Sequence, residues 1–270
     1  MEHKRNLMSK LFAILAFVIC TAFVVNEYSL VFQLQQEVDY FTTDKQGNIY
    51  TVKGDELIKY DKTGKLRYRY SNKQFGKIDY VDASNMLKLL VFYKGFLTVV
   101  YLDNTLSENG KYIALDEINR QQSQLVCTSH NNNIWLYDQQ NMELVRLNDN
   151  LETVQQTGNL NQLLNLNIQP TELLEYNNKV YLNSPNTGVL VFDIYGTYYK
   201  TIPIQGVRHF QALGEMVYCV TQEKVTAYNL QTSEISEVSM PLQEYENVRI
   251  EKNHLVVQSK DGLGVYSIKI

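Results

Sequence analysis

The chain has few of the residues that mark disordered segments or disulfide scaffolds. Only 4 of its 270 residues are proline, 3 are cysteine and 1 is tryptophan. So few prolines argue against a disordered or linker-rich chain, and three cysteines cannot form a disulfide framework. Cys127 and Cys219 lie in apolar runs, where we expect small buried side chains; the alternatives are a disulfide or a reactive thiol. The fold must therefore be stabilised by a hydrophobic core, for which 44% hydrophobic residues are available.

The sequence also lacks the short motifs of common metal, nucleotide and hydrolase sites. It contains no HExxH, CxxC, acidic calcium loop, GxSxG or glycine-rich phosphate loop. No two of the four histidines stand at metal-ligand spacing. No catalytic, cofactor-binding or metal residue is therefore predicted from a motif, and no cofactor is expected.

No run of basic residues occurs in the body of the chain. Without residues 1–22, the chain has 22 Lys+Arg and 28 Asp+Glu, a net charge of −6. A mildly acidic domain of this kind has no electrostatic footprint for a phosphate backbone. We therefore expect no nucleic-acid partner.

The first 25 residues differ in character from the rest. Three basic residues within Met1–Lys10 precede Leu11–Val25, which has no charged residue. This pattern is typical of a signal peptide, and Ala22 would suit a cleavage site. The alternative is an uncleaved membrane anchor, although a spanning helix usually needs ~20 apolar residues. Lipidation of Cys20 is disfavoured by the bulky Ile19. We predict an exported protein, periplasmic or attached through this segment alone to a membrane that faces the periplasm.

A strand-forming pattern recurs along the remaining chain. Twenty Tyr and ten Phe residues favour β-strands. Two features recur six times. The first is a polar turn that leads into an apolar strand, and the second, farther along the chain, is a large apolar residue followed by a short polar one. The latter pairs are Tyr60-Asp61, Leu102-Asp103, Leu147-Asn148, Phe192-Asp193, Tyr228-Asn229 and Tyr266-Ser267, spaced 36 to 45 residues apart. This period, with about four short strands per unit, predicts an all-β fold, a six-bladed β-propeller of four-stranded blades.

The clearest copy is Gly188–Ile204, which has the pattern of a strand, a tight turn and a second strand. Asp193 can accept a hydrogen bond from its own backbone two residues on, and Gly196 supplies a positive φ. Asp61 and Gly64 stand in the same positions of the first copy. We therefore interpret all four as turn residues and not as ligands of a metal or phosphate.

The repeats are predicted to form one domain over residues 30–270. The units are expected at about residues 39–75, 76–113, 114–160, 167–205, 206–243 and 244–270. The last unit has only three strands, while residues 30–36 form a strand without a partner. We predict that this strand completes the last blade and closes the ring, which removes an exposed edge. Only Asn159–Asn167 has the pattern of a short helix.

Two segments carry a resemblance to a known family. The YDKTG of Tyr60–Gly64 and the FDIYG of Phe192–Gly196 resemble the repeats of NHL-type and YVTN-type six-bladed propellers. The resemblance covers about residues 30–270, and the chain as a whole is similar to a family of uncharacterised exported bacterial propellers. It implies a fold that hosts many functions.

The sequence is compatible with two classes of function. The short loops favour a non-catalytic cell-envelope scaffold that binds a protein or another envelope component; a structural assembly factor for an envelope complex is a related possibility. The alternative, implied by the resemblance, is a metal-dependent hydrolase of the lactonase or gluconolactonase type that uses the central channel. Side chains on the expected inner strands that could serve it are Asp79, Asp82, Glu172, Glu175, His209 and Glu251.

Four residues are candidates for binding. Arg208 and His209 lie on an expected inner strand, where alternation turns one of them toward the channel. That side chain could bind an anion or fasten neighbouring blades. Tyr195 and Tyr198 cluster with Tyr199 near the turn of the fourth unit. They could pack across strands or form an exposed patch.

Overall fold

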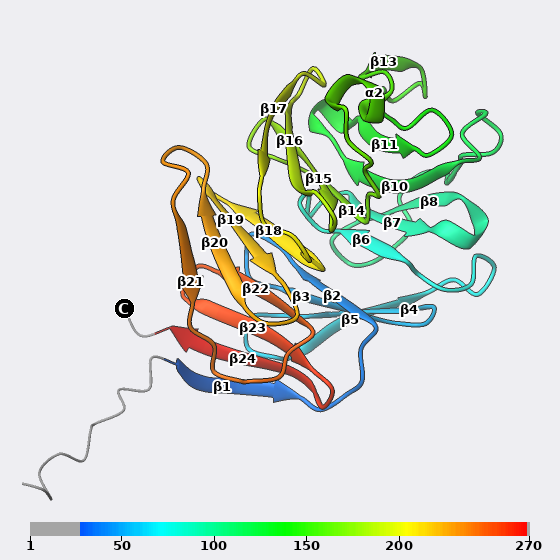
Figure 1. Cartoon of the computed structure of the whole chain (residues 1–270). Coiled ribbons are helices and arrows are strands. Elements are labelled where there is room, and N and C mark those ends of the chain that lie inside the picture. Colours follow the sequence, from blue (N-terminus) through cyan, green and yellow to red (C-terminus); the bar gives the residue numbers. More distant parts are fainter. Residues whose placement is uncertain (1–27, 269–270) are drawn as a thin grey trace, which may run out of the picture.

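Short apolar runs bounded by turn residues form the strands of six antiparallel sheets. The computed structural model describes residues 28–268, and each of its sheets has four strands. In five sheets the strands follow one another in chain order. The sheets are arranged as the blades of a ring (Figure 1). The prediction of a six-bladed β-propeller is therefore confirmed.

The blades are numbered along the chain, with the innermost strand of each named first. Blade 1 contains β2 (Tyr40–Thr43), β3 (Ile49–Lys53), β4 (Glu56–Tyr60) and β5 (Leu66–Ser71); blade 2 contains β6 (Tyr80–Asp82), β7 (Leu89–Tyr93), β8 (Thr98–Leu102) and β9 (Ile113–Ala114); blade 3 contains β10 (Ser123–Thr128), β11 (Ile134–Asp138), β12 (Glu143–Leu147) and β13 (Thr153–Gln156). Blade 4 contains β14 (Glu172–Tyr176), β15 (Lys179–Ser184), β16 (Gly188–Asp193) and β17 (Tyr198–Ile202); blade 5 contains β18 (His209–Leu213), β19 (Met216–Val220), β20 (Val225–Asn229) and β21 (Ile235–Val238); blade 6 contains β22 (Asn247–Glu251), β23 (His254–Ser259), β24 (Gly262–Ile268) and β1 (Tyr28–Leu34).

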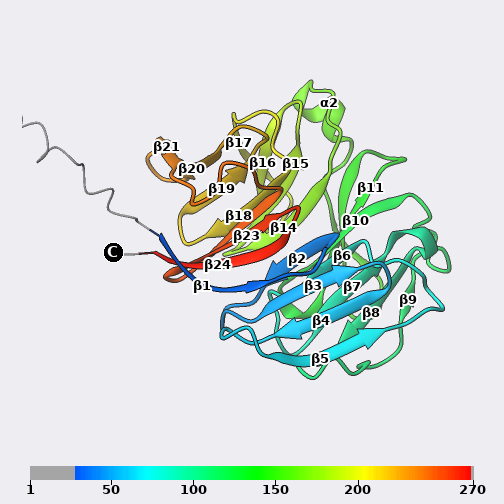
Figure 2. The same ribbon diagram turned by 90° about the horizontal axis from the view of Figure 1, so that it is seen from below.

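The strand β1 closes the ring, as predicted. It runs antiparallel to β24, so segments from the two ends of the described chain lie side by side (Figure 2). The strand begins two residues earlier than predicted, at Tyr28, whose hydroxyl donates to the carbonyl of Ser239 at 2.7 Å. This bond joins the closing strand to the segment between blades 5 and 6.

The turns divide between two faces of the ring. We call one the entry face, because the described chain begins there. Tyr28, the first described residue, pairs with Ile268, and the N–H of Ile268 donates to the carbonyl of Asn253 in the turn between β22 and β23. The entry face carries the turns that follow the inner strands, at residues 44–48, 83–88, 129–133, 177–178, 214–215 and 252–253. It also carries the turns between the third and fourth strands. The opposite face carries the turns between the second and third strands.

A turn held by its own side chain recurs between the third and fourth strands. Asp193 Oδ1 accepts the N–H groups of residues 195 and 197, both at 2.8 Å, and Gly196 has φ +84°. Asp61 accepts from residues 63 and 65, at 2.9 and 3.0 Å, and Gly64 has φ +83°. Hydrogen bonds from Thr63, together with the positive charge of the nearby Arg67, lower the pKa of Asp61 to about 2. Asp103, Asn148 and Asn229 form related turns.

Two smaller expectations are also met within the described residues. Cys127 and Cys219 are buried free thiols, and burial raises the pKa of Cys219 to about 12. The helix α2 spans Leu160–Leu164, and the side chain of Asn159 accepts the N–H of Gln162 at 3.0 Å. The signal or anchor predicted for residues 1–25 lies outside the described residues. Within residues 28–268, no helix is both long and apolar enough to cross a membrane.

Gly64→Ala is expected to destabilise the ring more than Gly54→Ala. Both glycines have positive φ, +83° and +58°, so each alanine adopts a left-handed conformation at a cost of about 1 kcal/mol. At Gly64 the added carbon would also lie 2.7 Å from Cδ2 of Phe32 in the closing strand, whereas nothing lies within 4 Å at Gly54. Urea unfolding measures both losses, and equal losses would contradict the proposed packing of β1.

Candidate functional site

Two tyrosines fill the central part of the channel. The rings of Tyr40 and Tyr80 lie 5.8 Å apart. Tyr40 donates to the carbonyl of Val81 at 3.3 Å, and Tyr80 donates to the carbonyl of Leu173 at 3.4 Å. Burial raises the pKa of both hydroxyls. The second bond joins blade 2 to blade 4 across the ring. A cavity of about 130 Å³ remains in the channel beside Tyr80, and Asp82, Glu172 and Glu251 are among the residues that line it.

The acidic side chains beside the channel join neighbouring blades. Asp82 of blade 2 accepts from the N–H and the hydroxyl of Thr128 in blade 3, at 2.9 and 2.6 Å. Glu251 of blade 6 accepts from Thr43 of blade 1 at 2.5 Å and from Gln211 of blade 5 at 3.1 Å. These carboxylates therefore satisfy hydrogen-bond donors within the ring.

The most extensive polar cluster lies between blades 3 and 4, at the entry face. Glu175 accepts from the Ser129 hydroxyl at 2.5 Å, from the N–H and Nδ1 of His130 at 2.9 Å each, and from Trp135 Nε1 at 2.7 Å. His130 Nε2 lies 2.6 Å from a guanidinium nitrogen of Arg146. The imidazole therefore carries its proton on Nδ1 and accepts from Arg146. Since both ring nitrogens are engaged, His130 is not positioned to act as a base toward solvent.

Glu175 and Glu251 are both half-buried, but the structure stabilises their negative charges to different extents. Burial alone would raise the pKa of Glu175, but the bonds from Ser129, His130 and Trp135 lower it below 4.5. Burial raises the pKa of Glu251, and its fewer partners do not compensate. The ring thus stabilises the charge of Glu175 and opposes that of Glu251.

A polar cavity of about 510 Å³ opens beside the Glu175 cluster. We call it the asparagine pocket. It is lined by Asn85, Asn131, Asn132, Asn133 and Asn177, with Lys45, Lys88, Tyr101 and Tyr176 among the other residues. Lys88 Nζ lies 4.3 Å from the centre of the Tyr101 ring, and 3.7 Å from Asp149. The pocket therefore presents amide, ammonium and aromatic groups on the entry face.

The predicted binding residues fall on two different faces. His209 Nδ1 lies 3.8 Å from Glu172 at the start of inner strand β18, while Arg208 is exposed before that strand and its N–H donates to Val220. Asp79 precedes β6 and accepts the N–H of Lys94 at 2.9 Å. Arg208, His209 and Asp79 therefore lie toward the opposite face and are not brought together with Tyr195 and Tyr198.

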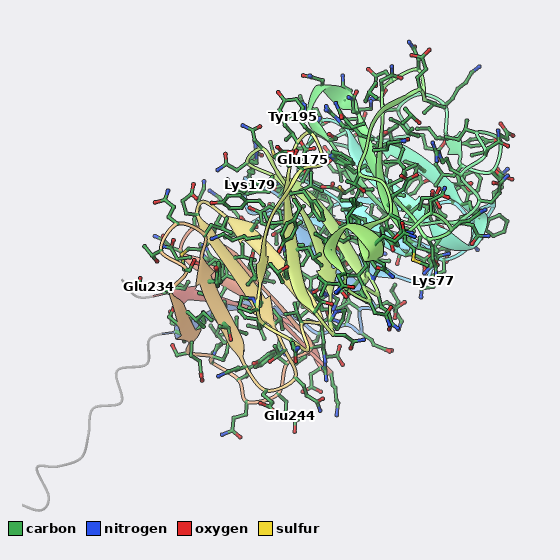
Figure 3. All side chains as sticks on the ribbon, turned by 45° about the horizontal axis from the view of Figure 1, so that its top comes forward. Lys77, Glu175, Lys179, Tyr195, Glu234 and Glu244 are labelled. Atoms are coloured by element: carbon green, nitrogen blue, oxygen red, sulfur yellow. The ribbon has the colours of Figure 1, made fainter. Side chains whose placement is uncertain are left out.

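Tyr195 and Tyr198 lie on the side of blade 4 that faces the Glu175 cluster. Tyr195 is 64% exposed in the turn before β17. Burial lowers the pKa of Arg146, whereas the nearby Glu175 and Tyr195 act in the other direction. Figure 3 shows Glu175 and Tyr195 in one part of the molecule, away from Lys77. Tyr198 packs against Phe192, with ring centres 5.9 Å apart.

The residues that sequence reasoning missed are His130, Arg146 and Trp135. His130 and Trp135 contact Glu175 across 45 and 40 positions, and Arg146 contacts His130 across 16, so no local motif could reveal them. One signal was present: Arg146 is a basic residue inside the apolar segment Leu144–Leu147, and it is buried. A buried arginine needs an acceptor, so that position predicts a polar cluster.

Comparison with known proteins supports the fold. No protein-family model matches the chain, and a search of curated sequences finds no match. Virginiamycin B lyase from Staphylococcus aureus is similar in structure (TM-score 0.60, 12% identity), with 90% of this chain and 100% of that chain covered. BamB from Moraxella catarrhalis is also similar (TM-score 0.52, 14% identity, 85% and 82% covered). The extracellular domain of a one-component system from B. thetaiotaomicron matches as well (TM-score 0.58, 11% identity, 87% and 33% covered). At these identities, the similarity establishes the propeller fold alone.

Glu175→Gln and Glu251→Gln are expected to change stability in opposite ways at pH 7. The first places an amide NH₂ against hydrogen-bond donors and should cost about 1–3 kcal/mol. The second removes a charge that burial opposes while it keeps an acceptor oxygen, so it should be neutral or stabilising. Urea unfolding at pH 7 measures both, and a large loss in Glu251→Gln would contradict the assignment.

The pH dependence of the two variants should also differ. Because the folded pKa of Glu175 is lowered, its contribution is complete above pH 4.5 and is lost as the pH falls through the folded value. The loss of unfolding free energy caused by Glu175→Gln should therefore become smaller at acidic pH. Because the folded pKa of Glu251 is raised, stability is lost as the pH rises above 4.5. The free energy of unfolding of Glu251→Gln should therefore increase relative to that of the parent chain as the pH rises above 4.5.

Proposed function

We propose that the chain is a non-catalytic propeller scaffold of the cell envelope that binds a protein partner through the entry face. The proposal rests on which polar side chains form hydrogen bonds within the ring and which do not. The channel carboxylates accept hydrogen bonds from neighbouring blades. By contrast, Asn131, Asn132 and Asn177 are exposed around the asparagine pocket, and their side chains form no hydrogen bond within residues 28–268. The groups available for binding are therefore amides on a face, not acids in the channel.

The composition of this face suits a protein partner. Tyrosine, serine and asparagine are enriched in the protein-binding loops of antibodies, because tyrosine supplies rigid contact area and asparagine adaptable hydrogen bonds. Ser84 and Ser129 line the pocket, and Tyr195 lies near Arg146, which contacts His130 of the pocket lining. Lys45 adds a positive charge at the rim, so we propose that the contacting segment is polar and acidic.

The proposed location and family rest on the sequence. The basic and then charge-free segments of residues 1–25 support export, with or without retention in a membrane. The matching turns at Asp61–Gly64 and Asp193–Gly196 support membership of the NHL-type and YVTN-type repeat propellers. The extracellular domain found among the similar structures is compatible with this location.

A photo-crosslinking residue at position 195 should capture a protein in the intact envelope. The matched control is position 112: Tyr112 is 53% exposed, but it contacts Phe75 and so lies by the opposite face. The tagged full chain is isolated from detergent-solubilised envelope after illumination. We expect one partner at position 195 and none at position 112. Capture at position 112 alone would contradict binding at the entry face.

Treatment with a chelator is expected to leave the melting temperature unchanged. The acids that a metal-dependent hydrolase would use, such as Asp82 and Glu251, already accept hydrogen bonds from adjacent blades. Within residues 28–268, no group of three or more His, Cys, Asp or Glu side chains is arranged to hold a metal ion. Elemental analysis and a thermal melt of the purified chain provide the test. A stoichiometric divalent ion, with a lower melting temperature after its removal, would favour the hydrolase.

A further inference from the structure

A second cavity on the entry face is surrounded by basic side chains. It lies between blades 6 and 1, has a volume of about 430 Å³, and is lined by three lysines from three different turns and by a histidine. We call this the lysine pocket, after Lys45, Lys62, Lys252 and His254. The ammonium groups of the three lysines form no ion pair or hydrogen bond within the described residues. They therefore remain available for an external anion.

The acids near the lysine pocket do not neutralise it. Asp44 is buried and accepts from two backbone N–H groups, from Asn48 Nδ2 and from the Tyr50 hydroxyl. Asp61 forms an ion pair with Arg67 at 2.7 Å. Glu251 accepts from Thr43, to which Arg249 also donates. These three acids stand against five basic side chains, namely Lys45, Lys62, Lys252, Arg67 and Arg249, so positive charge is locally in excess in a chain with a net charge of −4.

The path of the chain places this pocket near the N-terminal segment. The strand β1 begins at Tyr28 on the entry face and pairs there with Ile268, whose N–H donates to the carbonyl of Asn253. Asn253 itself lines the pocket. Only residues 26 and 27 separate Tyr28 from the charge-free Leu11–Val25. Three extended peptide units span at most about 11 Å, which is close to the Debye length of about 8–10 Å in physiological salt. A membrane that held Leu11–Val25 would therefore lie within electrostatic reach of this face.

Exposed apolar side chains accompany the lysines on the same side of the ring. Leu87, in a turn of the entry face, is 69% exposed, and Leu30, near the start of β1, is 55% exposed. Leucine and tyrosine beside lysine are typical of surfaces that rest at a membrane interface. Among the six outer strands, only β1 and the shorter β9 and β13 carry no charged residue.

We propose that the lysine pocket binds the phosphate headgroup of an anionic phospholipid, so that the entry face lies against a membrane surface. Lys45, Lys62 and Lys252 supply the positive charge, and His254 and the amide of Asn253 supply further donors. This inference uses the envelope location proposed above but does not require the protein partner. Its residues belong to blades 6 and 1, apart from the crosslinking position Tyr195 in blade 4.

The test measures lipid binding by the full chain in a neutral detergent. The probes are dihexanoyl phosphatidylglycerol, dihexanoyl phosphatidylcholine and inorganic phosphate, each titrated calorimetrically. We expect phosphatidylglycerol to bind at least about tenfold more tightly than the other two, a difference of about 1.4 kcal/mol. Its affinity should fall as salt is raised from about 0.1 M to about 1 M, because screening shortens the range of the lysine charges.

The decisive variant is K45Q/K62Q/K252Q, which should lose at least about tenfold in affinity for phosphatidylglycerol. The matched control is K73Q/K77Q/K94Q, which removes the same charge at exposed positions on the opposite face and should bind like the parent. A thermal melt verifies that both variants are folded; if the triple variant is not, Lys62→Gln alone replaces it, with a smaller loss expected. The proposal is overturned by unchanged binding in the pocket variant, by equal losses in both triple variants, or by equal binding of inorganic phosphate. Crosslinking at position 195 reports separately on the protein partner.

Discussion

The pairing of β1 with β24 is the constraint on which the rest of the ring depends. Each blade packs one face of its sheet against the preceding blade and the other against the next, so no blade is complete alone. The pairing joins Tyr28–Leu34 to Gly262–Ile268, at the two ends of the described chain. Phe32 of this strand also packs against the turn at Gly64, so the closure links blade 6 to blade 1 through side chains as well as the backbone. A long-range closure of this kind makes folding of the ring cooperative, because the last blade lacks its outer strand until both ends have met.

Polar bonds between inner strands add specificity to this apolar packing. Asp82, Glu175 and Glu251 each reach a neighbouring blade, and each accepts from hydroxyl, amide or backbone donors that would otherwise be buried without a partner. Such groups cost free energy unless they are satisfied, so they fix the position of one blade against the next. The acids that a channel hydrolase would require therefore already accept hydrogen bonds from neighbouring blades. The structural demand of the ring thus competes with catalytic chemistry for the same side chains.

The sequence predicted those features that are encoded locally. Asp193 and Gly196 act within five residues, so the turn and its repeat could be recognised, and the closing strand followed from the missing fourth strand of the last unit. The Glu175 cluster could not be predicted in this way, because Glu175 meets Ser129, His130 and Trp135 only after two blades pack. The tyrosine content indicates β-strands, but the position of Tyr40 and Tyr80 in the channel depends on how the blades are arranged around the ring. The sequence also placed His209 on an inner strand. It did not predict that His209 and Tyr195 lie toward opposite faces of the ring, because that depends on the direction of each strand in the folded blade.

The two pockets of the entry face suggest how one surface could serve two contacts. The asparagine pocket and the lysine pocket share Lys45, which projects from the turn after the inner strand of blade 1. The chain enters the ring beside the lysine pocket, whereas the exposed tyrosine of blade 4 lies beside the other. If a membrane surface covers blades 6 and 1, a protein that reaches blades 2 to 4 from the same side must itself lie at that surface. If both proposals hold, the partner is a protein in or on the membrane, and its acidic segment would meet Lys45 between the two pockets.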